Sequence, residues 1–112
     1  MDIKNTIVSQ IKYLPFKIKA CVLYGSFARG SQTPDSDIDV LFVSDEVNPK
    51  KHRRGQETAS IKTCFSLGLP LDILLLTAKE CISNFRNHNP LFLDIAWEGI
   101  ILKVNSTSNF YI

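Results

Sequence analysis

Two aspartates set two positions apart carry the first sign of chemistry in this sequence. Asp37 and Asp39 bracket the start of the apolar run from Ile38 to Val43. Because side chains two residues apart in a strand point to the same face, both carboxylates should project together. Neighbouring carboxylates repel each other unless a cation lies between them, and Mg²⁺ prefers such oxygen ligands. Taken alone, the pair fits a solvated strand start equally well.

Asp72 strengthens the metal interpretation because it lies in the most apolar segment of the chain, residues 69–76. A buried carboxylate without a partner is costly and normally becomes protonated, whereas a nearby metal ion keeps it ionised. Acidic side chains from two strands that converge on one point form the geometry of two-metal phosphoryl transfer. One of them can also take the proton of an attacking hydroxyl. The alternative is that Asp72 lies at the mouth of its strand and faces water.

A glycine-serine turn precedes the aspartates and has the features of a phosphate-binding loop. Gly25 ends the apolar run over residues 17–24, and its missing Cβ would let a polyphosphate approach the backbone closely. The residues after it begin a helical turn, whose free N–H groups favour anions. Ser26 adds a hydroxyl donor and Arg29 a planar, permanently charged fork, while Gly30 lets the chain turn away. The alternative is an ordinary tight connection between a strand and a helix.

The elements that position these residues follow from hydrophobic spacing and from helix-start and helix-stop residues. We predict helices over residues 2–14, over 26–30, up to Leu67, from a capping box at Thr77, and through Glu98 from Asn89-Pro90. Strands are predicted over residues 17–24, 38–43, 71–76 and 100–104, with Ile38, Val40 and Phe42 facing the core. This order predicts an α/β fold, a small mixed sheet flanked by helices, in a single domain over residues 1–112.

Composition narrows the class of protein. The chain has 112 residues, 45% of them hydrophobic and 21% charged, which is typical of a globular domain. A formal net charge of +2 is too small for a protein that coats nucleic acid, and no apolar run is long enough for a bilayer. The three cysteines show no metal-ligand spacing, which favours reduced thiols in a cytoplasmic protein. We also expect Trp97 to pack in the core, and the basic run at residues 50–54 to be a solvated segment.

The spacing of the motifs resembles a known family. Gly25-Ser26, ten intervening residues, then Asp37-x-Asp39, with Asp72 on a later apolar strand, is similar to the nucleotidyltransferase fold of the DNA polymerase β superfamily. The compact length resembles the minimal nucleotidyltransferases of that superfamily, which are often encoded beside a HEPN-domain partner as a toxin–antitoxin pair. The segment from Ile95 to Leu102 resembles the C-terminal helix and strand of the family.

The resemblance implies a role for each matching residue. Gly25 and Ser26 would bind the triphosphate of ATP, with support from Arg29. Asp37, Asp39 and Asp72 would hold two Mg²⁺ ions, and Asp72 would accept the proton of the acceptor hydroxyl. The implied reaction is attack on the α-phosphorus of ATP, with transfer of AMP and release of pyrophosphate.

The resemblance also implies a partner. The expected acceptor is a tyrosine of a HEPN ribonuclease toxin, which the chain would silence as an antitoxin. Because only residues 105–112 follow the last predicted strand, we expect the wall that holds the base or acceptor to come from a partner or a second copy. Direct nucleic-acid binding and homo-oligomer formation stay open. The alternatives are nucleotidyl transfer to a small molecule such as an aminoglycoside, and a non-catalytic antitoxin that covers its partner.

Overall fold

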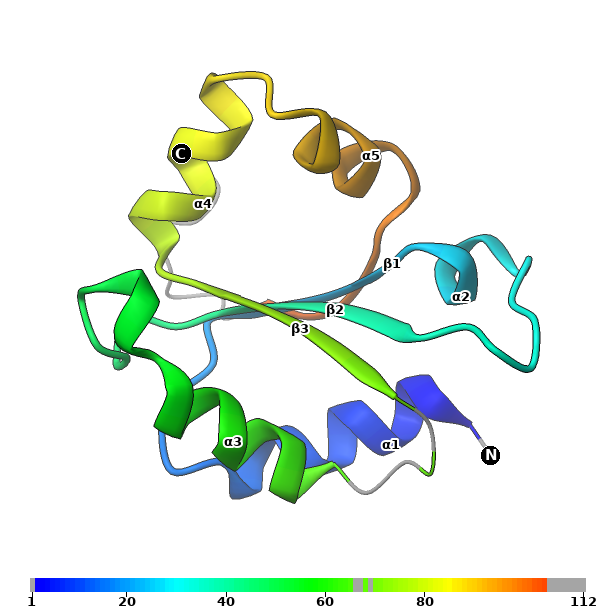
Figure 1. Cartoon of the computed structure of the whole chain (residues 1–112), viewed down its shortest axis with the longest axis horizontal. Helices are drawn as coiled ribbons and strands as arrows, with labels where there is room; N and C mark the ends of the chain where they lie inside the picture. Colours follow the sequence, from blue (N-terminus) through cyan, green and yellow to red (C-terminus); the bar gives the residue numbers. More distant parts are fainter. Residues whose placement is uncertain (1, 66–67, 69, 105–112) are drawn as a thin grey trace.

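The structure is a computed structural model and describes residues 2–65, 68 and 70–104. Its helices are α1 (Ile3–Gln10), α2 (Ser26–Arg29), α3 (Gly55–Cys64), α4 (Ala78–Arg86) and α5 (Pro90–Glu98), with single 3₁₀ turns η1 (Ile11–Tyr13) and η2 (Lys51–Arg53). Its strands are β1 (Ala20–Tyr24), β2 (Ile38–Val43), β3 (Leu71–Leu76) and β4 (Ile100–Val104). Helices α1 and α3 lie on one side of the sheet and α4 and α5 on the other (Figure 1).

The described strands form one mixed sheet in the order β3-β2-β1-β4. Strand β1 runs antiparallel to both β2 and β4, whereas β2 and β3 are parallel and joined by a crossover through α3. The centre of the sheet is the most buried part, because β1 and β2 have neighbours on both edges and helices on both faces. The predicted α/β fold with a small mixed sheet is therefore confirmed.

Strand β2 divides its side chains between two hydrophobic cores. Ile38, Val40 and Phe42 join the core under α1 and α3, as predicted. Leu41 and Val43 join the second core, under α4 and α5. Since alternate residues share a face, Asp39 projects on the side of the second core, at the end of the strand.

Local signals placed the later helices correctly. The Thr77 hydroxyl accepts from the Glu80 N–H at 3.2 Å, and the Glu80 carboxylate accepts from the Thr77 N–H at 2.8 Å. This reciprocal pair is the predicted capping box. The Asn89 side chain accepts from the Leu91 N–H, and Pro90 begins α5 as expected.

Tertiary structure overturns three details of the sequence analysis. Strand β1 begins at Ala20 rather than at residue 17. Trp97 is 91% exposed rather than part of the core, because α5 turns Phe92 and Ile95 inward instead. In the basic run, residues 50–53 are exposed as predicted, but Arg54 is buried. Leu67, the predicted end of α3, and residues 105–112 lie outside the described residues.

The three cysteines are free thiols, with Cys21 and Cys81 fully buried and Cys64 partly so. Their apolar surroundings fit the predicted role as reduced packing residues. Over the described ranges, no helix combines the length and the apolar character needed to cross a membrane.

Candidate active site

A row of polar side chains crosses three strands at one end of the sheet. In the strand register, Asp39 of β2 lies opposite Tyr24 of β1 on one side and opposite Asp72 of β3 on the other. Directly paired residues project to the same face of a sheet, so the two carboxylates stand side by side. The parallel pairing of β2 and β3 thus joins two predicted site residues that are 33 positions apart in the sequence.

Asp39 is the electrostatic centre of this row. Its pKa is raised to about 6, first by burial, then by a hydrogen bond with Asp72 and the charges of Asp72 and Asp37. The charge of Arg29 works in the opposite direction and lowers the pKa of Asp39. The three predicted acids and the predicted arginine therefore all act on one another, as the sequence analysis requires.

The shared hydrogen bond tests whether these residues fit a metal ion. Two adjacent carboxylates are stable only when a proton or a cation screens their repulsion, and here a proton does so. A divalent cation could replace that proton, because carboxylate oxygens are its preferred ligands. Within the described ranges, however, no three His, Cys, Asp or Glu side chains converge into a complete ligand set. This fits Mg²⁺ better than a tightly caged metal, since Mg²⁺ binds through one or two carboxylates plus substrate phosphates and water.

The flanking acids are open to solvent. Asp72 is exposed in β3 and Asp37 is exposed just before β2, whereas Asp39 is half-buried. The water-facing alternative for Asp72 is therefore the correct one. Its exposure leaves Asp72 accessible to an acceptor group that approaches from outside.

Gly25 closes one side of the row through its backbone. Its φ of 74° and ψ of −155° lie in a region open essentially only to glycine. A Cβ on Gly25 would overlap the Asp39 carboxylate, Oδ2 above all. The missing side chain thus accommodates the catalytic carboxylate itself, a role that the sequence analysis had assigned to phosphate approach alone.

The turn after Gly25 is shorter than a typical phosphate-binding helix. Helix α2 has one turn, with the N–H groups of Ala28 and Arg29 both directed at the Gly25 carbonyl at 3.1 Å. Gly30, in the left-handed region, ends it. So short a helix has little macrodipole, so phosphate binding here would depend on single donors, among them Ser26 and Arg29.

Sequence reasoning missed two neighbours of the site. The Arg29 guanidinium donates to Glu98, at the end of α5, over 2.7 Å between Nη1 and Oε1. Tyr24 is buried beside the acids; burial, then the charges of Asp39 and Asp72, raises its pKa to about 12. Tyr24 could have been noticed because it adjoins Gly25. No local signal marks Glu98, which is 69 residues from Arg29.

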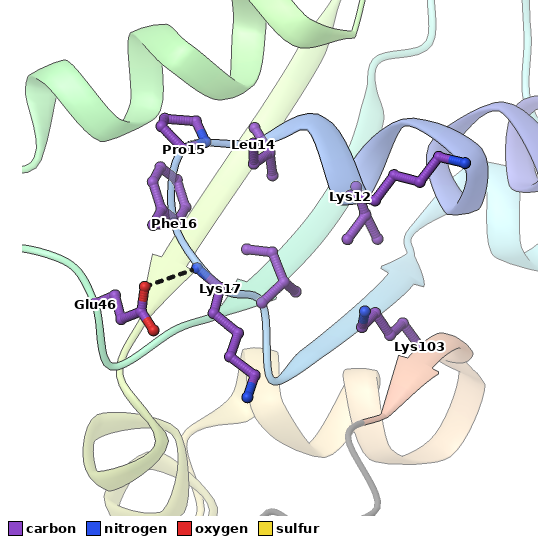
Figure 2. A pocket seen from close by; sticks show the side chains of 9 residues that line it. Lys12, Leu14, Pro15, Phe16, Lys17, Glu46 and Lys103 are labelled. Carbon is purple, nitrogen blue, oxygen red and sulfur yellow. Dashed lines mark hydrogen bonds between the residues drawn. The ribbon is translucent and has the colours of Figure 1, made fainter.

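A second hollow lies at the other end of the strands (Figure 2). Its volume is about 320 Å³, and its rim carries Lys12, Lys17 and Lys103 beside an apolar floor. The ammonium groups of Lys12 and Lys17 point away from each other, while Glu46 accepts from the Lys17 backbone N–H at 3.1 Å (Figure 2). None of the predicted site residues borders this hollow, so the acidic row is the candidate active site.

Comparison with known proteins identifies the family. Residues 4–98 match the family described as the nucleotidyltransferase domain. The chain belongs to this family. The match spans every residue of the acidic row, the Gly25-Ser26 turn and Glu98. In this nucleotidyltransferase domain, the site derived from geometry and the motif spacing noted in the sequence are therefore the same residues.

Two kinds of relative support the assignment. A protein of Methanocaldococcus jannaschii, provisionally named a protein adenylyltransferase, is 52% identical over 49 residues, which cover 42% of this chain and 49% of that protein. The chain thus spans about half the length of this relative. A toxin–antitoxin crystal structure with AMP-PNP superposes with a TM-score of 0.54, at 18% identity over 93% of this chain and 75% of the other. A mutant MntA–HpeT toxin–antitoxin structure gives 0.55, at 18% identity over 95% and 76%. These structural likenesses establish the nucleotidyltransferase fold.

Proposed function

We propose that this nucleotidyltransferase domain transfers AMP from ATP to a protein hydroxyl, in a Mg²⁺-dependent reaction. The observation that carries the proposal is the pairing of Asp39 with Asp72 across β2 and β3, with Gly25 against the Asp39 carboxylate. Asp37, Asp39 and Asp72 would hold the metal ions. Bound Mg²⁺ would neutralise charge on the phosphates as pyrophosphate leaves.

The residues of the chain divide the remaining work. Ser26 and Arg29 would orient the triphosphate beside the acidic row, where Arg29 already acts on Asp39. The acceptor oxygen forms a bond to the α-phosphorus, and the bond from that phosphorus to the oxygen bridging to the β-phosphate breaks. The exposed Asp72 would take the proton of the acceptor hydroxyl.

We further propose that the acceptor is a tyrosine of a HEPN ribonuclease toxin, so that the modification makes this chain an antitoxin. Two comparisons favour a protein acceptor over a small molecule such as an aminoglycoside. One relative carries the name of a protein adenylyltransferase, and the fold is shared with chains of toxin–antitoxin structures. The proposed place of action is the cytoplasm, where ATP and a ribonuclease would both be available.

The test is transfer of label from α-labelled ATP to a co-expressed HEPN protein in the presence of Mg²⁺. Wild-type protein should label it, and a chelator should abolish labelling. Asp37→Ala combined with Asp39→Ala should reduce labelling at least about a hundredfold, because the metal ligands are lost. Asp35→Asn is the matched control, since it removes an exposed carboxylate from the same loop.

Two outcomes would contradict the proposal in different ways. Labelling that survives the double substitution would mean that these aspartates are not the site. Inhibition of the toxin by wild-type and doubly substituted protein alike, without labelling, would show a non-catalytic antitoxin that acts by covering its partner. Circular dichroism of each variant would verify that the fold is intact.

A further inference from the structure

Glu98 connects the end of α5 to the arginine of the proposed phosphate turn. Arg29 occupies the last position of α2, and Glu98 the last position of α5. Their side chains meet through Nη1 and Oε1 at 2.7 Å, with Glu98 more shielded from solvent than Arg29. This contact joins an element after the third strand to the turn after the first one, so it belongs to the folded site and not to a local motif.

The contact occupies only part of the arginine. A guanidinium carries five N–H donors in a fixed planar fork. Glu98 accepts from Nη1, and over the described ranges the side chain of Arg29 has no other hydrogen-bond partner. About half of the Arg29 side chain is exposed (49%). A bidentate pair would consume one edge of the fork, whereas this single bond leaves most donors available to an anion.

The position of Arg29 is suited to a phosphate ligand. Its charge lowers the pKa of Asp39 against the larger opposing effects of burial and the other acids, so the guanidinium lies within electrostatic reach of the acidic row. A free arginine loses considerable rotamer entropy when it binds a ligand. A carboxylate that holds one N–H beforehand reduces this loss, which is the usual benefit of preorganisation.

We propose that Glu98 is a positioning residue that holds Arg29 beside the acidic row, with its remaining donors available to the triphosphate of ATP. The inference rests on the proposed function, because it assumes that ATP binds at this row. Glu98 itself does not touch the nucleotide. Its effect should therefore act through Arg29 and be felt in ATP affinity rather than in the chemical step.

The test is a double-substitution cycle measured by calorimetric titration with Mg²⁺ and a non-hydrolysable ATP analogue. Glu98→Gln should weaken affinity about two- to fivefold, the range expected for a partly exposed ion pair. In an Arg29→Gln background, Glu98→Gln should cause no further loss. Asp94→Asn is the matched control, because it removes an exposed carboxylate one turn earlier on α5 and should leave affinity unchanged.

Transfer kinetics and stability give independent readouts. Glu98→Gln should raise KM for ATP with little change in kcat, and Glu98→Asp should recover part of the affinity. Urea unfolding should show Glu98→Gln to be folded at the assay temperature, so that the affinity change cannot come from unfolding.

Several results would overturn the inference. Equal affinity of wild type and Glu98→Gln would remove the role, and tighter binding would mean that Glu98 competes with phosphate for Arg29. The same loss with and without Arg29 would reduce Glu98 to a purely structural residue. If the wild type binds no ATP analogue, the proposed function itself fails and the inference with it, which distinguishes that failure from the others.

Discussion

At the scale of single residues, the site depends on what Gly25 lacks. Its backbone conformation belongs to the region that glycine alone visits freely, and its Cα faces the Asp39 carboxylate with no room for a methyl group. Gly30, five residues later, also has a positive φ (73°), but no atom lies near the position of its Cβ. The two glycines therefore separate backbone strain from contact with the site.

Gly25→Ala and Gly30→Ala should have different effects for this reason. Each should lower the free energy of unfolding by about 1–3 kcal/mol, because alanine is strained at positive φ. Only Gly25→Ala should also displace Asp39 and reduce transfer about a hundredfold, as misplaced catalytic groups do. Urea unfolding and labelled-AMP transfer measure the two effects. Equal transfer activity in both variants would show that Gly25 does not accommodate Asp39.

At the scale of elements, α5 presents two aromatic residues to opposite environments. Phe92 is buried and meets Phe85 edge to face, with ring centroids 5.0 Å apart. Trp97, the single tryptophan of the chain, projects into solvent from the same helix. The hydrophobic character of the segment suggested a core position for both, but a helix buries one face only.

Substitution of the two aromatics should reveal this division. Phe92→Ala should lower the free energy of unfolding by about 3–5 kcal/mol, because it leaves a cavity in the core under α4 and α5. Trp97→Ala should change it by no more than about 0.5 kcal/mol, as is usual for exposed positions. Urea unfolding followed by circular dichroism compares them. Acrylamide should quench the fluorescence of Trp97 in the folded wild type nearly as well as in urea; strong protection would contradict the exposed position.

At the scale of the whole molecule, Arg54 fastens the end of the sheet opposite the acidic row. Its guanidinium donates to both carboxylate oxygens of Glu80, at 2.6 and 3.1 Å, and to the carbonyls of Asn48 and Leu75. Arg54 thereby joins the loop after β2, the end of β3 and the start of α4. Because its charge is buried, it depends on Glu80 for compensation.

Acid should weaken this connection. Burial favours a higher pKa for Glu80, but hydrogen bonds from Arg54 and Thr77 outweigh it, and the pKa of Glu80 is lowered. A carboxyl group with a lowered pKa stabilises the fold above its unfolded pKa of about 4.3, and that stability is lost as the pH falls through the folded value. Glu80→Gln should therefore lower the free energy of unfolding at pH 7 by about 1.5–3 kcal/mol. The difference from wild type should shrink below about pH 4.

Urea unfolding between pH 3 and pH 7 measures this dependence. Asp45→Asn is the control, because the pair of Asp45 with Lys19 is more exposed and should contribute no more than about 1 kcal/mol. A Glu80→Gln variant whose deficit stays constant down to pH 3 would show that the charge of Glu80 does not stabilise the fold.

The sequence alone determined the features that depend on a few neighbouring residues. The strand from Ile38 to Val43, the capping box at Thr77 and the spacing of Gly25-Ser26 from Asp37 and Asp39 were predicted correctly, because periodicity and capping are local. Tertiary structure alone decided which distant side chains meet: Asp39 with Asp72 through strand register, Arg29 with Glu98, and Arg54 with Glu80. Such contacts follow from how strands pair and helices pack, and no short segment of the chain encodes them.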